Sequence, residues 1–210
     1  MPSEIVDALA DLEEDKVLEL VKQELAAGTP ADEILAACQE GMVKVGERFE
    51  RAEYFVSDLM MAGEIFKEVG ELLGPNLTAG GVGTGGKVVV GTVKGDIHDI
   101  GKDIVVNMLK SANLEVTDLG VDVPAEQFVQ ALIETGAPVL GMSGLLTLAF
   151  DSMKETVDAL EAQGLRDKVK VMIGGAPVDG EVCKFVGADE WGADAQAAVR
   201  LCKGWLEAAV

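Results

Sequence analysis

From residue 87 onward the chain alternates between two hydrophobic patterns, and this alternation limits its fold more than any other feature. Apolar runs typical of strands recur five times, and a run with the helical period follows each of them. The predicted strands cover residues 87–93, 114–118, 139–143, 169–173 and 188–191. The predicted helices cover about residues 101–112, 125–135, 151–163, 179–185 and 194–208. Five such units predict an α/β domain with a parallel sheet that has helices on both faces.

A parallel sheet of this kind binds its ligands at one edge. If the strands take the order 2-1-3-4-5, as in flavodoxin-like and other Rossmann-like folds, the first and third strands flank the topological switch point. The loops after these two strands contain His98 and Ser143. We therefore expect both residues to contribute to one site.

The first part of the chain shows only the helical period. Apolar residues recur at helical spacing in three segments, residues 5–21, 34–45 and 55–73. Thr29 is expected to cap the second helix, because Pro30 then takes its first helical position. We expect a helical bundle over residues 1–75, a flexible Gly-rich linker over residues 76–86 that lets the two halves move, and the α/β domain over residues 87–210.

Charge and composition argue against several classes of protein. A formal net charge of −20 disfavours nucleic-acid binding, which needs clustered lysine and arginine. No apolar run approaches the ~18 residues of a membrane span, and the acidic start of the chain does not resemble a signal peptide. The three cysteines form no CxxC pair and are typical of reduced, buried thiols, so we expect a cytoplasmic protein.

Two glycine-rich stretches resemble nucleotide-binding motifs but do not fit them. Residues 81–86 match GxGxxG, yet they precede a strand, whereas a dinucleotide fingerprint follows a strand. Residues 95–102 have five residues between their glycines instead of the four of a phosphate loop. A phospho-receiver domain shares the predicted topology but needs an aspartate at the end of the third strand, where this chain has Met142, Ser143 and Gly144.

His98 is the only histidine of the chain, and it lies in the loop after the first predicted strand. Neutral imidazole is a common metal ligand, and a carboxylate such as Asp96 can hold its second nitrogen. Gly95 and Gly101 flank this pair and permit a bulky ligand to approach the backbone closely. The alternative is a loop histidine in an ordinary hydrogen bond, with glycines that serve only a tight turn.

The segment around His98 resembles the DxHxxG signature of cobalamin-binding domains. It reads Lys94-Gly95-Asp96-Ile97-His98-Asp99-Ile100-Gly101-Lys102. Further matches occur at residues 142–147, 173–176 and 187–189. The first half is similar to the helical cap domain that precedes the cobalamin domain in methionine synthase. The whole chain therefore resembles the corrinoid proteins of the methylamine, methanol, methoxyaromatic and betaine methyltransferase systems.

The resemblance implies a base-off/His-on corrinoid, whose dimethylbenzimidazole leaves cobalt and enters a slot beside the sheet. His98 then becomes the lower axial ligand of cobalt, and Asp96 accepts a hydrogen bond from its other ring nitrogen. These two residues tune the reaction at cobalt. Ser143 and Thr147 offer hydroxyl groups to the nucleotide tail, and the Gly174–Gly175 pair supplies the gap that the tail needs.

Most of the implied cofactor contacts lie in the α/β domain, and two lie in the cap. They are Gly95, Asp96, Ile97, His98, Asp99, Ile100, Gly101, Met142, Ser143, Leu145, Leu146, Thr147, Gly174, Gly175, Ala176, Gly187, Ala188, Trp191, Met60 and Gly63. Tyr54, Phe55, Leu59 and Met61 fall in the same cap segment. Simpler interpretations stay open, with Leu145, Leu146 and the cap residues in the core and Gly174–Gly175 as a turn.

The chain departs from methionine synthase at one position. There a serine in the loop after the third strand extends the Asp–His pair, and the matching residue here is Ala149. We therefore expect a His–Asp pair whose proton relay ends at Asp96 or passes to water.

The implied function is that of a methyl carrier with no independent catalytic activity. Cob(I)alamin accepts a methyl group from a substrate held by a substrate-specific methyltransferase. The resulting methylcob(III)alamin delivers it to a second methyltransferase that uses tetrahydrofolate or a thiol, and a reductive activation protein is a further expected partner. The alternatives are a cobalamin-binding sensor or regulatory module, a small mutase subunit, which lacks a cap, and a flavodoxin-like flavin protein, which leaves His98 unexplained.

Overall fold

The structure is a computed structural model that describes residues 2–74 and 85–208. The chain divides into two compact units whose main boundary falls at this gap, and each unit is described by itself. The linker predicted over residues 76–86 lies outside the described residues, apart from Gly85 and Gly86.

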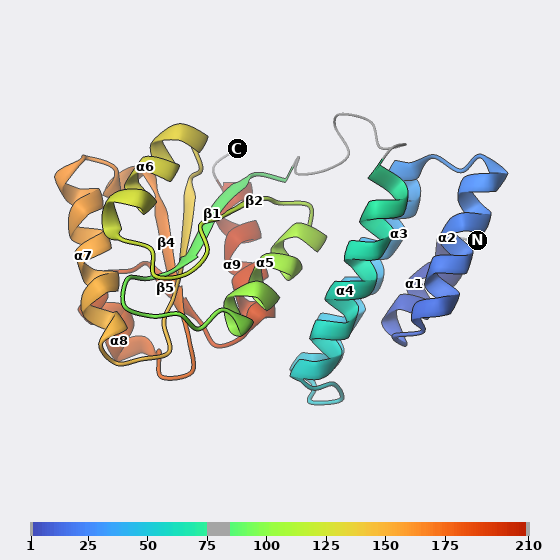
Figure 1. The fold of residues 1–210 in the computed structure, drawn as a ribbon, viewed down its shortest axis with the longest axis horizontal. Helices are drawn as coiled ribbons and strands as arrows, with labels where there is room; N and C mark the ends of the chain where they lie inside the picture. The colour runs from blue at the N-terminus through green and yellow to red at the C-terminus, as the bar shows by residue number, and fades with distance from the viewer. Residues whose placement is uncertain (1, 75–84, 209–210) are drawn as a thin grey trace. The chain divides into compact units, whose positions relative to one another are not determined.

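The first unit contains four helices (Figure 1). They are α1 (Pro2–Ala10), α2 (Glu14–Ala27), α3 (Ala31–Glu50) and α4 (Val56–Leu73). All four contribute buried apolar side chains, among them Leu9, Val21, Ile34 and Ile65. Helix α1 approaches α3 closely at Gly41, where an added Cβ would lie 2.9 Å from the Cβ of Leu9. The predicted helical region is confirmed.

Two details of the first unit differ from the prediction. The helical spacing of residues 5–21 is divided between α1 and α2, and Leu12 between them has a left-handed backbone with φ of 58°. Thr29 does not cap α3, so that prediction is wrong. Pro30 precedes the helix, and the Thr29 hydroxyl donates to the Glu24 carboxylate at 2.5 Å. The hydroxyl thus bonds to the end of the preceding helix.

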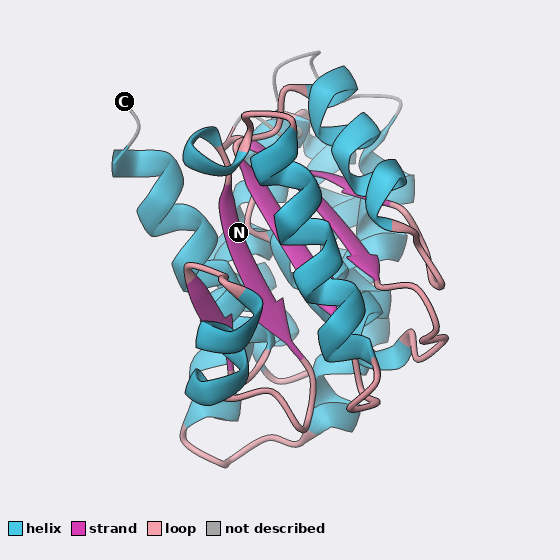
Figure 2. Ribbon diagram, turned by 90° about the vertical axis from the view of Figure 1, so that its left-hand side faces the viewer, coloured by secondary structure: helices cyan, strands magenta, loops and turns pink. Residues whose placement is uncertain are grey.

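The second unit is built on a five-stranded parallel sheet (Figure 2). Its strands are β1 (Lys87–Thr92), β2 (Glu115–Asp118), β3 (Val139–Ser143), β4 (Lys170–Gly174) and β5 (Glu190–Gly192). Their order is β2-β1-β3-β4-β5, so the predicted order is confirmed. All pairs are parallel, and the carboxyl ends of the strands therefore meet at one edge of the sheet.

Helices cover both faces of this sheet (Figure 1). They are α5 (Ile100–Ser111), α6 (Ala125–Thr135), α7 (Ala149–Ala162), α8 (Gly180–Val186) and α9 (Ala195–Ala208), with a short 3-10 turn at Arg166–Lys168. Helices α6, α7 and α8 pack on one face through a buried cluster that includes Phe128, Met153 and Ile173. Helices α5 and α9 lie on the other face, where Cys202 of α9 contacts Met172. Across the described ranges, no helix is both long enough and apolar enough to cross a membrane.

Candidate functional site

The loop between β1 and α5 carries His98 at the carboxyl edge of the sheet. It begins after Thr92, turns at Gly95 with a left-handed φ of 83°, and ends where α5 starts at Ile100. The buried Thr92 hydroxyl donates to the carbonyl oxygen of His98 at 3.0 Å. The loop is thereby tied back to its own strand, while the His98 side chain stays 50% exposed.

Asp96 and His98 form a short, direct pair. The Nδ1 atom of His98 lies 2.7 Å from Oδ1 of Asp96, and the His98 amide donates to the same oxygen at 2.9 Å. The Asp96 side chain is 0% exposed, so the pair has one buried and one half-exposed member. Because Nδ1 is held by Asp96, Nε2 is the ring nitrogen available to a metal.

The second oxygen of Asp96 reaches the loop after β3. Its Oδ2 atom accepts the amide of Leu145 at 2.6 Å and the amide of Leu146 at 3.0 Å. One carboxylate therefore joins the two loops that flank the switch point of the sheet. Burial would raise its pKa, but hydrogen bonds from the His98 and Leu146 amides, the His98 ring and the Leu145 amide lower that pKa to about 2.

Ala149 is buried in the first turn of α7, beside the loop that Asp96 holds. Within residues 85–208, the hydrogen-bond partners of the Asp96 carboxylate are nitrogen donors, two on each oxygen, and none is a hydroxyl group. Backbone amides of Leu145 and Leu146 thus satisfy the oxygen that does not contact His98. This geometry is that of a pair, as the alanine predicts.

The strand register places a row of small residues beside this pair. Thr92 pairs with Ser143, Ser143 with Gly174, and Gly174 with Gly192, all at the carboxyl edge. Alternation along β4 puts Gly174 on the same face as Met172, which is the face covered by α9. An added Cβ at Gly174 would meet only the Gly192 carbonyl oxygen, at 3.5 Å. The row therefore leaves room for a flat group against the strands.

Gly175 has a different role from Gly174. Its φ is 142°, and an added Cβ would collide with the carbonyl oxygen of Gly144 in the loop after β3. The Gly144 amide in turn donates to the Gly174 carbonyl at 3.0 Å. Gly175 therefore permits two loops to touch, which agrees with the simple-turn interpretation, whereas an added Cβ at Gly174 would make one ordinary contact.

Exposed apolar side chains lie on both loops of the Asp96–His98 pair. Ile97 is 72% exposed and Leu148 is 78% exposed, and Ile100, Leu145 and Leu146 are also exposed. The interpretation of Leu145 and Leu146 as core residues is therefore wrong, because their amides, and not their side chains, point to buried Asp96. Clustered exposed apolar side chains are typical of a surface that a ligand or partner covers.

The remaining predicted residues of the second unit lie at the carboxyl edge of the sheet, within its strands or at its amino edge. Asp99, Gly101, Thr147 and Ala176 are exposed in loops or a helix start at the carboxyl edge. Met142 is buried in the core cluster on the face of α6 and α7, and half-buried Trp191 packs against the same cluster. Gly187 and Ala188 precede β5, at the amino edge of the sheet. Gly187 and Ala188 therefore lie at the opposite edge of the sheet from His98.

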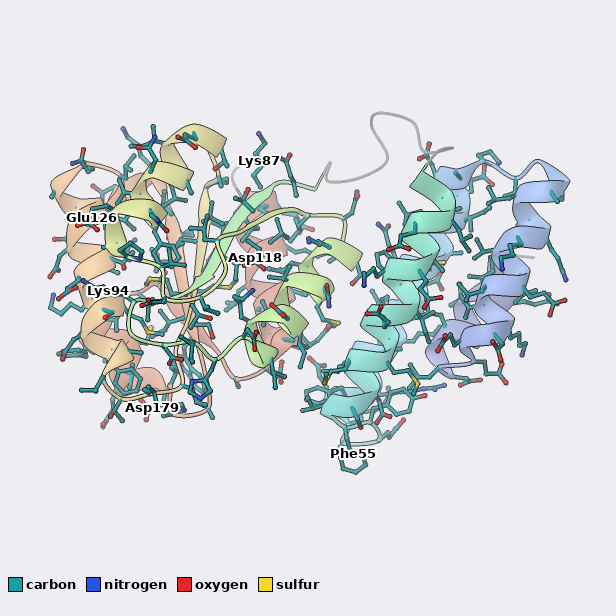
Figure 3. All side chains as sticks on the ribbon, in the orientation of Figure 1. Phe55, Lys87, Lys94, Asp118, Glu126 and Asp179 are labelled. Carbon is teal, nitrogen blue, oxygen red and sulfur yellow. The ribbon has the colours of Figure 1, made fainter. Side chains whose placement is uncertain are left out.

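The cap residues divide into buried and exposed members. Leu59 and Gly63 are buried in α4, as the simpler interpretation expects. The Tyr54 hydroxyl donates to the Ala10 carbonyl at 2.8 Å and accepts a hydrogen bond from Arg48. Met60 and Met61 are about half exposed, and Phe55, at 70% exposure, projects from the start of α4 (Figure 3). The exposed members are available to cover a ligand or partner.

Two acidic residues near the site were not among the predicted ones. Asp118, labelled in Figure 3 at the end of β2, accepts a hydrogen bond from the buried Lys102 ammonium group at 2.6 Å. Burial lowers the pKa of Lys102, but its bonds to Asp103 and Asp118 outweigh this and raise that pKa. Asp122 accepts the amide of Gly95 at 2.7 Å. Lys102 stands inside the quoted signature, whereas no local pattern marks the two aspartates as partners of that loop.

Comparisons with known proteins agree with this geometry. Two family models, each described as a B12 binding domain, match residues 3–73 and 86–200. Dimethylamine corrinoid protein 3 of Methanosarcina acetivorans is 40% identical over 203 residues, which are 97% of this chain and 95% of that protein.

Two solved structures are similar over nearly the whole chain. A cobalamin-binding protein from Desulfitobacterium hafniense DCB-2 has a TM-score of 0.81 at 44% identity, with 98% of both chains covered. A methanol:cobalamin methyltransferase complex from Methanosarcina barkeri contains a chain with a TM-score of 0.85 at 28% identity, covering 97% of this chain and 78% of that one. The protein therefore belongs to the family of B12-binding corrinoid proteins.

Proposed function

We propose that this protein is a corrinoid methyl carrier in which His98 is the lower axial ligand of cobalt. The observation that carries the proposal is the 2.7 Å contact between His98 Nδ1 and the buried carboxylate of Asp96. This contact fixes which ring nitrogen carries the proton and leaves Nε2 for the metal.

The residues present fit a corrinoid in three respects. A half-exposed imidazole lies at the sheet edge where α/β folds bind ligands. Exposed apolar side chains of Ile97, Leu145 and Leu148 lie on the two loops that Asp96 joins, and they suit the apolar rim of a large macrocycle. The row that contains Ser143 and Gly174 has room for a flat nucleotide tail in a base-off state.

A bound corrinoid would supply cobalt as the carrier of the methyl group between donor and acceptor. The chain holds and tunes this group. Asp96 accepts the Nδ1 proton of His98, which raises the basicity of the imidazole and orients its ring. With a pKa of about 2, the Asp96 carboxyl group stays ionised near neutral pH and retains this role.

The relatives indicate the partners. Dimethylamine corrinoid proteins and a methanol:cobalamin methyltransferase complex are named for methylated substrates. We infer that a substrate-specific methyltransferase loads this carrier, that a second methyltransferase with a tetrahydrofolate or thiol acceptor unloads it, and that a reductive activation protein restores cobalt after accidental oxidation. The substrate class that fits these relatives is a methylated amine or methanol.

Substitution of the proposed ligand tests this function. His98→Ala should retain part of its corrinoid, because the nucleotide tail and the apolar rim remain. The visible spectrum of the methylated holoprotein should shift to that of a cofactor without a nitrogen ligand, and methyl transfer should slow by at least about tenfold, equivalent to ~1.4 kcal/mol.

The matched control is Lys94→Ala, which changes an exposed residue of the same loop. It should leave the spectrum and the transfer rate unchanged. A wild-type spectrum in His98→Ala would show that His98 is not the ligand. A wild-type chain that binds no corrinoid would contradict the proposed function.

A further inference from the structure

Asp122, from another loop, forms two hydrogen bonds with the backbone next to the Asp96 side chain. Asp122 belongs to the segment between β2 and α6. Its Oδ1 atom accepts the amide proton of Gly95 at 2.7 Å, and its own amide donates to the carbonyl oxygen of Asp96 at 2.9 Å. The two bonds run in opposite directions and lie on either side of the Gly95–Asp96 peptide, at the amide of Gly95 and at the carbonyl of Asp96.

Asp122 holds this position in an uncommon backbone conformation. Its φ is 53°, in the left-handed region that few residues other than glycine, asparagine and aspartate enter. Gly95, its hydrogen-bond partner, is also left-handed, with φ of 83°. Strained backbone of this kind persists only where the surrounding contacts enforce it, and it is frequent at functional sites.

The segment that contains Asp122 is also held by contacts that do not involve the Asp122 side chain. The next residue, Val123, is buried, forms a parallel bridge with Val93 and donates its amide to the Thr92 carbonyl at 3.0 Å. These contacts fix the segment beside β1. The Asp122 side chain itself is exposed and adds nothing to the core. Its carboxylate instead accepts the amide of Gly95, the residue that precedes Asp96.

We propose that Asp122 is a positioning residue for the Asp96–His98 pair, so that it determines how firmly His98 binds cobalt. This inference rests on the proposed function. The chain of contacts is short. Asp122 holds the backbone of Gly95 and Asp96, this backbone directs the Asp96 carboxylate, and the carboxylate orients the His98 ring. Loss of the first contact lets the imidazole rotate away from cobalt and lowers the share of His-on protein.

Three substitutions distinguish the effect of the Asp122 carboxylate from that of the left-handed backbone at this position. Asp122→Asn keeps the oxygen acceptor and tolerates a left-handed backbone. Asp122→Gly keeps that backbone and the amide donor but removes the acceptor. Asp122→Ala removes the acceptor and disfavours the left-handed conformation. The matched control is Asp158→Ala, which removes an exposed carboxylate that pairs with Lys154 at 2.8 Å.

Two measurements follow the contact and its consequence. In the apoprotein, exchange of the Gly95 amide proton should speed up at least tenfold in the glycine and alanine variants. In the Co(II) holoprotein, the share of the electron paramagnetic resonance signal that shows coupling to one axial nitrogen should fall at least threefold in these variants. Asp122→Asn and Asp158→Ala should match wild type in both.

Each result decides the proposal. A wild-type nitrogen-coupled share in Asp122→Gly would overturn it, and so would an Asp122→Asn variant as impaired as Asp122→Gly. Should Asp122→Ala fail to fold, the glycine variant carries the test. Failure of the proposed function is distinct, since wild-type holoprotein would then lack nitrogen coupling while Gly95 exchange could still be compared.

Discussion

Asp96 concentrates the chemistry of the site in one side chain. Its two oxygens accept four hydrogen bonds, from the ring and amide of His98 and from the amides of Leu145 and Leu146, while the side chain is fully buried. A buried carboxylate is tolerated only when such bonds replace its hydration. The residue that orients the imidazole is therefore also one that stabilises the fold.

Substitution of Asp96 by Asn should show this stabilising role. The amide would turn an NH2 group toward N–H donors, and the free energy of unfolding should fall by about 2–4 kcal/mol. Urea unfolding of the apoprotein followed by tryptophan fluorescence measures it, because Trp191 and Trp205 both lie in the second unit. The exposed control Asp158→Asn should change stability by no more than about 0.5 kcal/mol.

The pH dependence of stability in wild type and in Asp96→Asn shows how much of the effect comes from the negative charge of Asp96. The pKa of Asp96 is about 2 in the folded chain, below the ~3.9 of an unfolded aspartate. Its ionised form therefore contributes stability above about pH 4, and this contribution is lost as the pH falls toward 2. Between pH 5 and pH 2, wild type should lose about 2–3 kcal/mol more than Asp96→Asn. Parallel pH profiles would contradict the assignment.

At the scale of elements, strand register assembles the site. Alternating hydrophobic patterns predicted each strand of the sheet to within two residues, and the order of the strands then placed the loops after β1 and β3 together. The same logic explains why Gly187 and Ala188 lie elsewhere. They precede β5, and residues before a parallel strand reach the opposite edge from residues after one. The match to the cobalamin-binding signature predicted these two residues as cofactor contacts, but their position before β5 does not place them at the edge that carries His98.

The row of small residues makes a prediction at this scale. Gly174→Leu would place a bulky side chain where the row of small residues leaves room against the strands, so corrinoid affinity should fall at least about tenfold, equivalent to ~1.4 kcal/mol. Gly174→Ala should bind more weakly than wild type but better than Gly174→Leu.

Gly204→Ala is the control for the glycine series, because an added Cβ there meets nothing within 4 Å. Titration with cobalamin followed by visible absorbance measures all three affinities. Wild-type affinity in a folded Gly174→Leu variant would show that the nucleotide tail does not bind along this row.

At the scale of the whole molecule, sequence patterns predicted the elements better than the contacts between distant loops. The helical first unit, the parallel sheet and the Asp96–His98 contact all follow from short-range patterns and one signature. The contact of Asp122 with Gly95 and that of Lys102 with Asp118 join residues from different loops, and only the folded chain reveals them. Thr29 is a case in which a local pattern misled. Its sequence predicted a cap for the following helix, but its hydroxyl bonds to Glu24 of the preceding helix.

The most direct measurement uses the fact that His98 is the only histidine in the chain. Untagged protein is prepared with 15N-labelled histidine, loaded with cobalamin and reduced to Co(II). One axial 14N nucleus splits the electron paramagnetic resonance lines threefold, whereas one 15N nucleus splits them twofold. Ligation by His98 predicts a threefold pattern in unlabelled protein that becomes twofold on labelling. A threefold pattern that persists in labelled protein would identify the dimethylbenzimidazole as the ligand and would contradict the central claim.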